Sequence, residues 1–324
     1  MFTPKLRKIM IPIKALSFTS VALLLVASKL AAAIVIPINA YDWAAAREIV
    51  LGLRVRSESF TDFRPNKIHV ARIDVGSGRF SFATTPLDPA VGHPMPEPDL
   101  SGYAIMMKCE TTSDFLKGRR ALGENMVFAV NCSYFAPWTP PYTHAYAVPA
   151  DLIVSDGLMI APDNRVGDSN PKLVPRNEDA CIVVYNDKRA GFRNVTRWED
   201  VSGMDFAGGG YMIVLRDGKN VANASKPYPR TIAGVSADGR YVYFLCSNGK
   251  FPLLYEGITL SECAQIMLAL GASSAVEWDG GGSASMVTWE NGKAKFLLNH
   301  GQRKVCNSVG VIYKPASSEV ATMP

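Results

Sequence analysis

Aspartate–glycine and asparagine–glycine pairs recur along this chain, and each lies beside a short run of apolar residues. The pairs occur at Asp156–Gly157, Asp217–Gly218, Asp238–Gly239 and Asn248–Gly249. Glycine accepts the positive φ angles of tight turns, and such pairs are typical of hairpins between antiparallel strands. The alternating run at residues 67–75 (KIHVARIDV) is a further strand pattern. The sequence therefore predicts that much of the chain is antiparallel sheet.

Three segments predict helices beside this sheet. The strongest signal runs from about Leu260 to Leu270, where Thr259 and Glu262 form a capping box at the start of an apolar stripe. Weaker helical patterns cover residues 112–122 and 44–50. We predict an α+β fold: a mixed, mostly antiparallel sheet with a few packed helices in a single domain.

The first 40 residues have the composition of a targeting segment. Five basic residues and no acid surround an apolar run from Ala15 to Ala27, which is short for a membrane span. If Lys29 is tolerated, the apolar stretch is longer and remains as an anchor. We expect residues 1–40 to be a signal peptide or N-terminal anchor, residues 47–315 the folded domain and residues 316–324 a polar tail. The domain is then exported, to the periplasm or the extracellular space.

The net charge argues against a nucleic-acid partner. The formal charge of the whole chain is +5, and the five basic residues of the N-terminal segment account for all of it. A neutral body without a basic run lacks the electrostatic footprint that a phosphate backbone requires. We expect no nucleic-acid binding, and membrane contact only through an uncleaved N-terminal segment.

Six cysteines are spread widely through the domain, with no CxxC pair among them. In an exported chain they could form three disulfides, but several lie in apolar patterns where a free cysteine acts as a small hydrophobic residue. Buried thiols with at most one bridge are the simpler expectation. The spacing does not favour a zinc site.

The run DGGGS at residues 279–283 directly follows an apolar strand pattern, AVEW at residues 275–278. Three successive glycines allow backbone N–H groups to converge on an anion, and a carboxylate at the end of a strand lies where sheet enzymes commonly hold catalytic groups. A flexible turn is the alternative interpretation. The run does not fit dinucleotide, P-loop or serine-hydrolase motifs, and the four histidines form no HExxH pair.

The DGGGS run is one of five motifs in a fixed order. These are NCSYF at 131–135, RTIAG at 230–234, GITLSE at 257–262, DGGGS at 279–283 and RKVCN at 303–307. Their succession resembles the phosphodiester glycosidase family over about residues 68–313. That resemblance implies hydrolysis of a sugar 1-phosphodiester at the anomeric carbon, which releases a free sugar and a phosphomonoester. The implied partner is a glycosyl phosphodiester or a phosphate-bearing glycan.

The resemblance also implies roles for individual residues. The candidate catalytic residues are Asp279, Arg230 and Arg303, because a carboxylate serves the reacting carbon and guanidinium groups bind phosphate oxygens in pairs. The candidate substrate-binding residues are Asn131, Ser133, Gly280, Gly281, Gly282, Ser283 and Asn307. We expect no metal site and no cofactor, although a calcium requirement does not follow from the sequence either way.

One residue departs from the family pattern, since Cys132 stands where the family usually has glycine. Cysteine would be strained there if the position requires a positive φ. This departure favours an alternative, a non-catalytic exported protein that binds a carbohydrate phosphate. A phosphodiesterase that cuts the P–O bond is a third hypothesis. Glu277, opposite in direction to its neighbours on the strand, is a second carboxylate candidate, and Glu262 is assigned to the capping box.

Overall fold

The computed structural model describes residues 41–60, 64–100, 102–140, 142–161, 178–223, 225–251, 253–298 and 303–315. The expected signal or anchor at residues 1–40 and the tail at residues 316–324 lie outside these ranges. Within them, no helix is both long enough and apolar enough to cross a bilayer.

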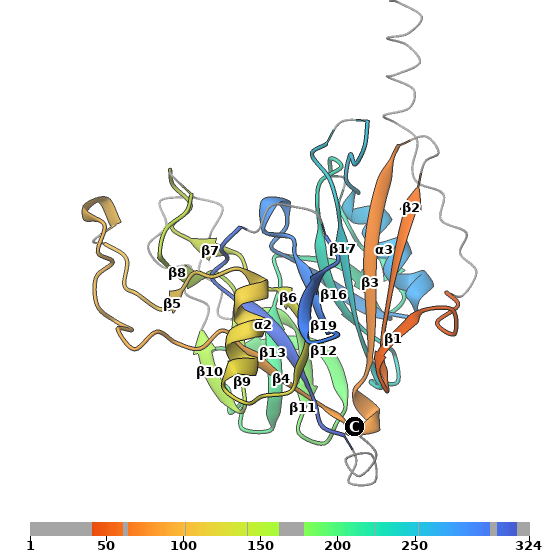
Figure 1. Cartoon of the computed structure of the whole chain (residues 1–324), viewed down its shortest axis with the longest axis horizontal. Helices are drawn as coiled ribbons and strands as arrows, with labels where there is room; N and C mark the ends of the chain where they lie inside the picture. Colours follow the sequence, from red (N-terminus) through yellow and green to blue (C-terminus); the bar gives the residue numbers. More distant parts are fainter. Residues whose placement is uncertain are drawn as a thin grey trace, which may run out of the picture.

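Strands dominate the described structure and form four sheets (Figure 1). The largest has the order β1 (Arg47–Val50), β2 (Leu53–Phe60), β3 (Asn66–Asp74), β17 (Tyr241–Ser247), β16 (Thr231–Val235), β18 (Ser274–Trp278), β14 (Met212–Arg216) and β15 (Lys219–Asn220). A second has the order β10 (Leu158–Ala161), β9 (Ile153–Ser155), β13 (Met204–Gly209), β11 (Glu178–Tyr185) and β12 (Ala190–Thr196). A third has the order β20 (Lys293–Phe296), β19 (Met286–Glu290), β6 (Met126–Asn131), β21 (Ser308–Tyr313) and β4 (Phe80–Thr84). The smallest consists of β5 (Met107–Lys108), β8 (Tyr146–Pro149) and β7 (Phe135–Ala136).

The predicted α+β class is wrong, because the molecule is mostly β. The described residues contain only two α-helices, α2 (Thr112–Ala121) and α3 (Leu260–Leu270), besides three short 3-10 turns. The helix expected at residues 44–50 is instead strand β1, which pairs antiparallel with β2. Gly52, at a φ of 93°, turns the chain back on itself, so tertiary pairing overrides a weak local helix preference.

The hairpin predictions are confirmed at three positions. Asp156–Gly157 joins β9 to β10, Asp217–Gly218 joins β14 to β15, and Asp238–Gly239 joins β16 to β17. Each glycine has a positive φ between 71° and 74°. Asn248–Gly249 lies instead in the loop that leads from β17 toward α3. Turn chemistry therefore located most of the chain reversals correctly.

One aromatic core joins the three larger sheets. Phe128 of β6 stacks on Phe244 of β17 at 5.6 Å between ring centres, and Phe244 lies 5.6 Å from the fully buried Trp278 of β18. Phe206 of β13 meets the same tryptophan edge-on at 6.2 Å. Helix α3 covers the opposite face of the largest sheet, and α2 packs on the β6 sheet. The core thus fixes the sheets relative to one another.

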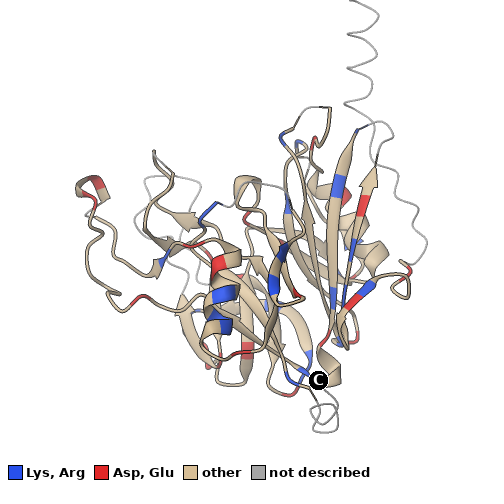
Figure 2. Cartoon of the chain, viewed as in Figure 1, with Lys and Arg blue, Asp and Glu red and all other residues tan. Residues whose placement is uncertain are grey.

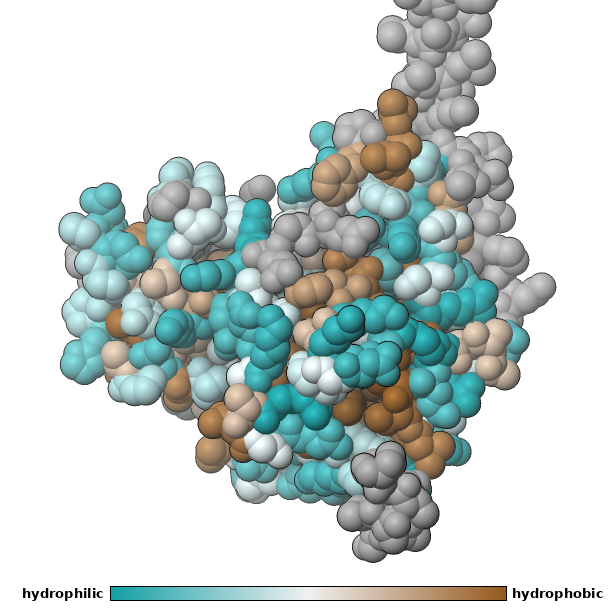
Figure 3. Space-filling view, viewed as in Figure 1, coloured by the Kyte–Doolittle hydropathy of each residue, from teal (hydrophilic) through white to brown (hydrophobic). Residues whose placement is uncertain are grey.

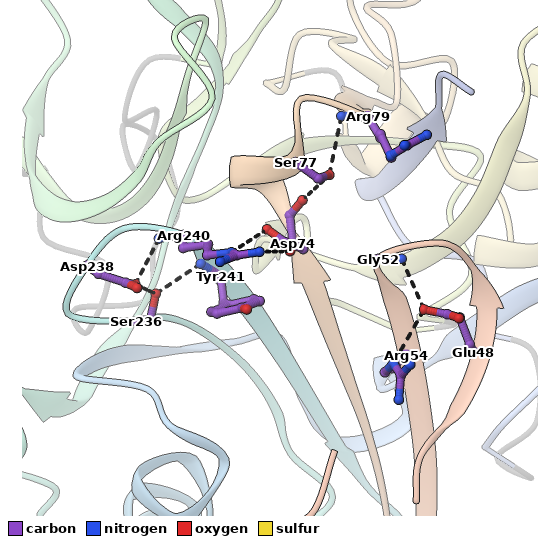
Figure 4. A network of polar contacts seen from close by, with 10 residues as sticks. All are labelled: Glu48, Gly52, Arg54, Asp74, Ser77, Arg79, Ser236, Asp238, Arg240 and Tyr241. Carbon is purple, nitrogen blue, oxygen red and sulfur yellow. Dashed lines mark hydrogen bonds and ion pairs between the residues drawn. The ribbon is translucent and has the colours of Figure 1, made fainter. Parts of the chain in front are cut away.

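A network of polar contacts closes the hairpin end of the largest sheet (Figure 4). Arg240 donates to both carboxylate oxygens of Asp74 at 3.0 and 2.8 Å. Asp238 accepts hydrogen bonds from the Ser236 hydroxyl at 2.5 Å and from the Arg240 backbone at 3.0 Å. Along the rest of the cartoon in Figure 2, basic and acidic positions are interspersed rather than gathered by sign.

The antiparallel registers place four sequence motifs at strand ends, two in the largest sheet at the end away from the hairpin and two in the β6 sheet beside it. Trp278 at the end of β18 pairs with Thr231 at the start of β16. Asn131 at the end of β6 pairs with Ser308 at the start of β21. The segments that follow or precede these residues, which carry the DGGGS, RTIAG, NCSYF and RKVCN motifs, therefore meet in one place.

Candidate functional site

Asp279 lies at the centre of this meeting point. Its backbone N–H donates to the Cys132 carbonyl at 2.9 Å, and its carbonyl accepts from Nδ2 of Asn131 at 2.6 Å. Both bonds tie the end of β18 to the segment after β6. The carboxylate is thereby held on a rigid strand end, which is the support that a reacting group requires.

The pKa of the Asp279 carboxyl lies close to neutral pH. The pKa of this carboxyl is raised from its usual value to about 7, mainly by burial, and the neighbouring carboxylates Asp151 and Glu277 act in the same direction. A hydrogen bond from Ser283 and the charge of Arg303 act in the opposite direction. A carboxyl group with a near-neutral pKa can exchange a proton at physiological pH, and such groups concentrate at functional sites.

The glycine run forms a tight turn against two other segments. Gly281 has a φ of 63°, and its N–H donates to the Pro229 carbonyl at 2.9 Å. A Cβ on Gly280 would lie 2.6 Å from that same carbonyl oxygen, so a side chain there would clash. Close approach, as well as turn geometry, thus requires glycine at these positions. In the described part of the chain, the N–H groups of Gly280 and Gly282 have no acceptor.

Arg303 lies directly against the turn. A Cβ on Gly282 would be 2.6 Å from its guanidinium carbon, and the guanidinium stacks over the Trp138 ring at 4.8 Å from the ring centre. Among the described residues no carboxylate or carbonyl accepts from Arg303. A cation beside a free backbone N–H can bind one oxyanion. Of the three glycine N–H groups expected to form an anion nest, that of Gly281 is already bonded within the protein, which leaves those of Gly280 and Gly282.

Arg230 is placed differently. Its guanidinium forms an ion pair with the buried Glu277 and also donates to the carbonyls of Ile258 at 3.3 Å and Lys226 at 3.0 Å. Glu277 points away from the aromatic core, as the strand alternation predicted. Burial raises the pKa of Glu277, and the charge of Arg230 opposes that rise. The sequence hypothesis treated the two arginines alike, whereas the structure gives Arg230 protein partners.

The predicted binding residues Asn131, Ser133 and Asn307 are buried beneath the site. Asn131 accepts hydrogen bonds through Oδ1 from the Thr231 hydroxyl at 2.9 Å and the Ser285 N–H at 3.0 Å. The Ser133 hydroxyl donates to the Tyr134 carbonyl at 2.6 Å and accepts from the Asp151 N–H at 3.0 Å. Asn307 supplies the carbonyl that accepts from Cys132 N–H at 3.0 Å. The side chains of Asn131 and Ser133 and the backbone of Asn307 brace the segments that carry Asp279, so we interpret all three as positioning residues.

Several residues of the site were missed at the sequence level. Asp151, fully buried, accepts from the Tyr134 N–H at 3.1 Å and contributes to the raised pKa of Asp279. Tyr134 lies near three carboxylates, and burial together with their charges raises the pKa of its hydroxyl well above the usual value. A Cβ on Gly281 would lie 2.8 Å from the Tyr228 hydroxyl. Tyr134 belongs to the NCSYF motif, so the sequence could have indicated it as a site residue. No sequence feature near Asp151 indicates a role in the site.

Cys132 carries no backbone strain, because its φ is not among the positive values of the described chain. Its side chain is buried in the aromatic core, and burial raises the pKa of its thiol. All six cysteines are buried and free, so the simpler cysteine expectation is confirmed. The departure from the family glycine therefore alters packing without distorting the site. Within the described ranges, no three His, Cys, Asp or Glu side chains gather closely enough to hold a metal ion.

Comparisons with known proteins concern the fold and the family of the chain. The chain resembles the catalytic domain of zebrafish N-acetylglucosamine-1-phosphodiester alpha-N-acetylglucosaminidase, auto-inhibited by its pro-peptide, with a TM-score of 0.56 and 15% identity over 86% of this chain and 87% of that one. It also resembles a hypothetical protein from Synechocystis, with a TM-score of 0.52 and 12% identity over 82% of this chain and 63% of the other. These likenesses concern the fold alone. A search of curated protein sequences gives no significant match. The family model described as phosphodiester glycosidase matches residues 124–312, which is more than half of the sequence, and this chain therefore belongs to the phosphodiester glycosidase family.

Proposed function

We propose that this protein hydrolyses a sugar 1-phosphodiester at the anomeric carbon and releases a free sugar and a phosphomonoester. The observation that carries the proposal is the pairing of two features at one strand end. The Asp279 carboxyl has a pKa of about 7, and Arg303 and the Gly282 N–H, both without protein acceptors in the described part, lie beside it. One feature can exchange a proton, and the other can hold a phosphate.

Arg303 and the glycine turn bind the phosphate group of the substrate. The guanidinium donates two parallel hydrogen bonds to phosphate oxygens, and the Gly282 N–H adds a third from a fixed direction. These groups stabilise charge that develops on the phosphate as the glycosidic C–O bond breaks. Trp138 holds the guanidinium plane by stacking, which limits the entropy that Arg303 loses on binding.

Asp279 acts at the anomeric carbon. In its ionised form the carboxylate takes a proton from the water that attacks the anomeric carbon, and it stabilises positive charge at that carbon. A phosphomonoester is already a good leaving group, so the departing oxygen needs little protonation. Arg230 acts here through Glu277, as a positioning pair under the strand end rather than as a phosphate ligand.

Reaction in oxygen-18 water tests which bond breaks. Attack at carbon places the label in the anomeric hydroxyl of the released sugar and leaves the phosphomonoester unlabelled. Free sugar incubated in the same water measures background exchange, and the Asp279→Asn variant measures non-enzymatic hydrolysis. Label in the phosphate would mean attack at phosphorus, and the phosphodiesterase hypothesis would replace this one.

A further inference from the structure

Large apolar side chains are exposed together in the loop between β17 and α3. The exposed fractions are 84% for Leu253, 65% for Leu254 and 45% for Phe251. Figure 3 shows the resulting hydrophobic tip at the top of the molecule, over the loop that follows β17. Single exposed leucines are ordinary, but a contiguous apolar projection marks an interaction site.

The backbone of this loop presents the apolar side chains in a fixed turn. Phe251 and Tyr255 exchange hydrogen bonds at 2.9 and 2.7 Å, and the Leu254 N–H donates to the Phe251 carbonyl at 3.0 Å. Leu253 has a φ of 68°, which is unfavourable for a branched side chain. The turn therefore holds a leucine outward in a strained conformation, which is a feature that clusters at binding sites.

The tip is connected to the candidate active site by an aromatic contact. The Lys250 ammonium lies 4.3 Å from the centre of the Tyr228 ring, and the Tyr228 hydroxyl packs against Gly281. On the other side of the glycine turn, Trp138 is 46% exposed beneath Arg303. Figure 1 shows the loop after β17 and the loop between β7 and β8 rising at the same end of the molecule. Two loops with exposed aromatic or aliphatic side chains thus flank the turn.

Cations outnumber acids near the apolar tip in the described part of the chain, although the loop itself carries one of each, Lys250 and Glu256. Lys250 and Lys226 are exposed, and Arg303 lies across the turn, whereas Glu256 is the acid of the same loop. Apolar side chains at a tip, with lysines and aromatic residues behind them, match the depth profile of a bilayer surface. The cations then meet anionic head groups. A soluble protein partner would not require this order of apolar, aromatic and basic layers.

We propose that this tip docks on an anionic bilayer surface, so that the active site takes its glycosyl phosphodiester from a lipid in that membrane. The substrate part of this inference rests on the proposed function, whereas the docking part does not. Leu253, Leu254 and Phe251 enter the acyl region, and Lys250 remains at the head groups. The phosphodiester of a membrane lipid is then presented at the level of Gly282 and Arg303.

Site-specific labelling tests the docking in the full chain. Because all six native cysteines are buried, a Leu253→Cys variant is labelled selectively by a thiol-reactive, environment-sensitive dye. With vesicles of phosphatidylcholine containing about one quarter phosphatidylglycerol, the dye emission shifts to the blue and is quenched by nitroxide groups on the acyl chains. Leu158→Cys, at a position 67% exposed on β10, is the matched control and keeps its aqueous emission.

Two results overturn the docking. One is a dye at residue 253 that stays aqueous while the protein is bound to vesicles through its N-terminal segment. The other is a blue shift that rises with protein concentration without lipid, since that would mean contact between two copies of the chain.

A second measurement separates docking from catalysis. The double variant Leu253→Asp with Leu254→Asp is expected to lose at least about 10-fold in turnover of a lipid-linked glycosyl phosphodiester in vesicles, because two exposed leucines no longer enter the bilayer. Turnover of a short water-soluble glycosyl phosphodiester stays unchanged. Equal turnover of the lipid substrate by variant and native protein contradicts the substrate inference. Failure of the native protein on both substrates, with the dye inserted, contradicts the proposed function and leaves the docking intact.

Discussion

At the hairpin end of β16, Arg240 donates to both carboxylate oxygens of Asp74, whereas at the opposite end of the same strand Arg303 lies over Gly282 with no acceptor in the described ranges. The first end is a set of exposed turns whose polar groups satisfy one another (Figure 4). The second end keeps a cation and two backbone N–H groups without an acceptor in the described part of the chain, beside a half-buried carboxyl that accepts a hydrogen bond from Ser283. Unpaired polar groups cost stability, and they persist where a ligand supplies the missing partner.

The same contrast separates the two motif arginines. The guanidinium of Arg230 forms an ion pair with Glu277 and donates hydrogen bonds to two carbonyls. The guanidinium of Arg303 instead stacks on the ring of Trp138. Sequence position alone does not distinguish them, because both precede a strand of the core. Under the proposed function, this difference assigns Arg230 to maintaining the site and Arg303 to contacting the substrate.

The largest expected effect comes from the carboxyl at the unsatisfied end. Asp279→Asn keeps the side-chain volume and removes the ionisable group, so turnover is expected to fall by about 100-fold or more. The measurement is kcat on a soluble glycosyl phosphodiester, with circular dichroism to show that the variant is folded. Near-normal kcat in a folded variant would remove Asp279 from the mechanism.

Substitution of the arginines tests the contrast between them. Arg303→Lys keeps the charge but loses the planar fork, so kcat/KM is expected to fall by about 10-fold or more with little change in Tm. Arg230→Lys disturbs the ion pair with the buried Glu277 and cannot keep both carbonyl contacts, so the matched variant is expected to lower Tm as well. Equal behaviour of the two variants in both measurements would contradict the assignment of separate roles.

The pKa of Asp279 predicts how stability depends on pH. The folded pKa of about 7 lies above the unfolded value, so folding takes up a proton between about pH 4 and pH 7. This contribution to the free energy of unfolding is present below pH 4 and is lost as pH rises through 7. Because solvent partly reaches the group, we expect a loss on the order of 1 kcal/mol. Denaturant unfolding at pH 5 and pH 8 measures it, and Asp279→Asn should abolish this part of the pH dependence.

Local signals predicted the strands, the turns and α3 well, because aspartate–glycine pairs and the capping box act over a few residues. A helix was predicted where the structure has strand β1, because pairing with β2, and not the local sequence, determines the conformation of that segment. Four of the five ordered motifs meet at Asp279, and the registers of β16, β18, β6 and β21 place them at neighbouring strand ends. That their residues form the active site stays a prediction. Asp151 could not be found, since its role depends on burial beside Asp279 and not on its sequence neighbours.

The smallest expected effect on turnover is that of a substitution at the hairpin end of β16, where the polar groups bond to one another. The Asp74–Arg240 ion pair joins two neighbouring strands, but the arginine side chain is 55% exposed. Water and salt therefore screen the attraction, and water solvates the aspartate when the arginine is removed. Arg240→Ala is therefore expected to leave kcat/KM unchanged within about twofold, since the hairpin lies at the opposite end of β16 from Asp279 and the strands between them stay intact. Any lowering of Tm should disappear at high salt, where the native pair is already screened. A larger loss of turnover than in Arg303→Lys would mean that the two ends of the sheet are coupled, and the division between a structural end and a substrate-binding end would not hold.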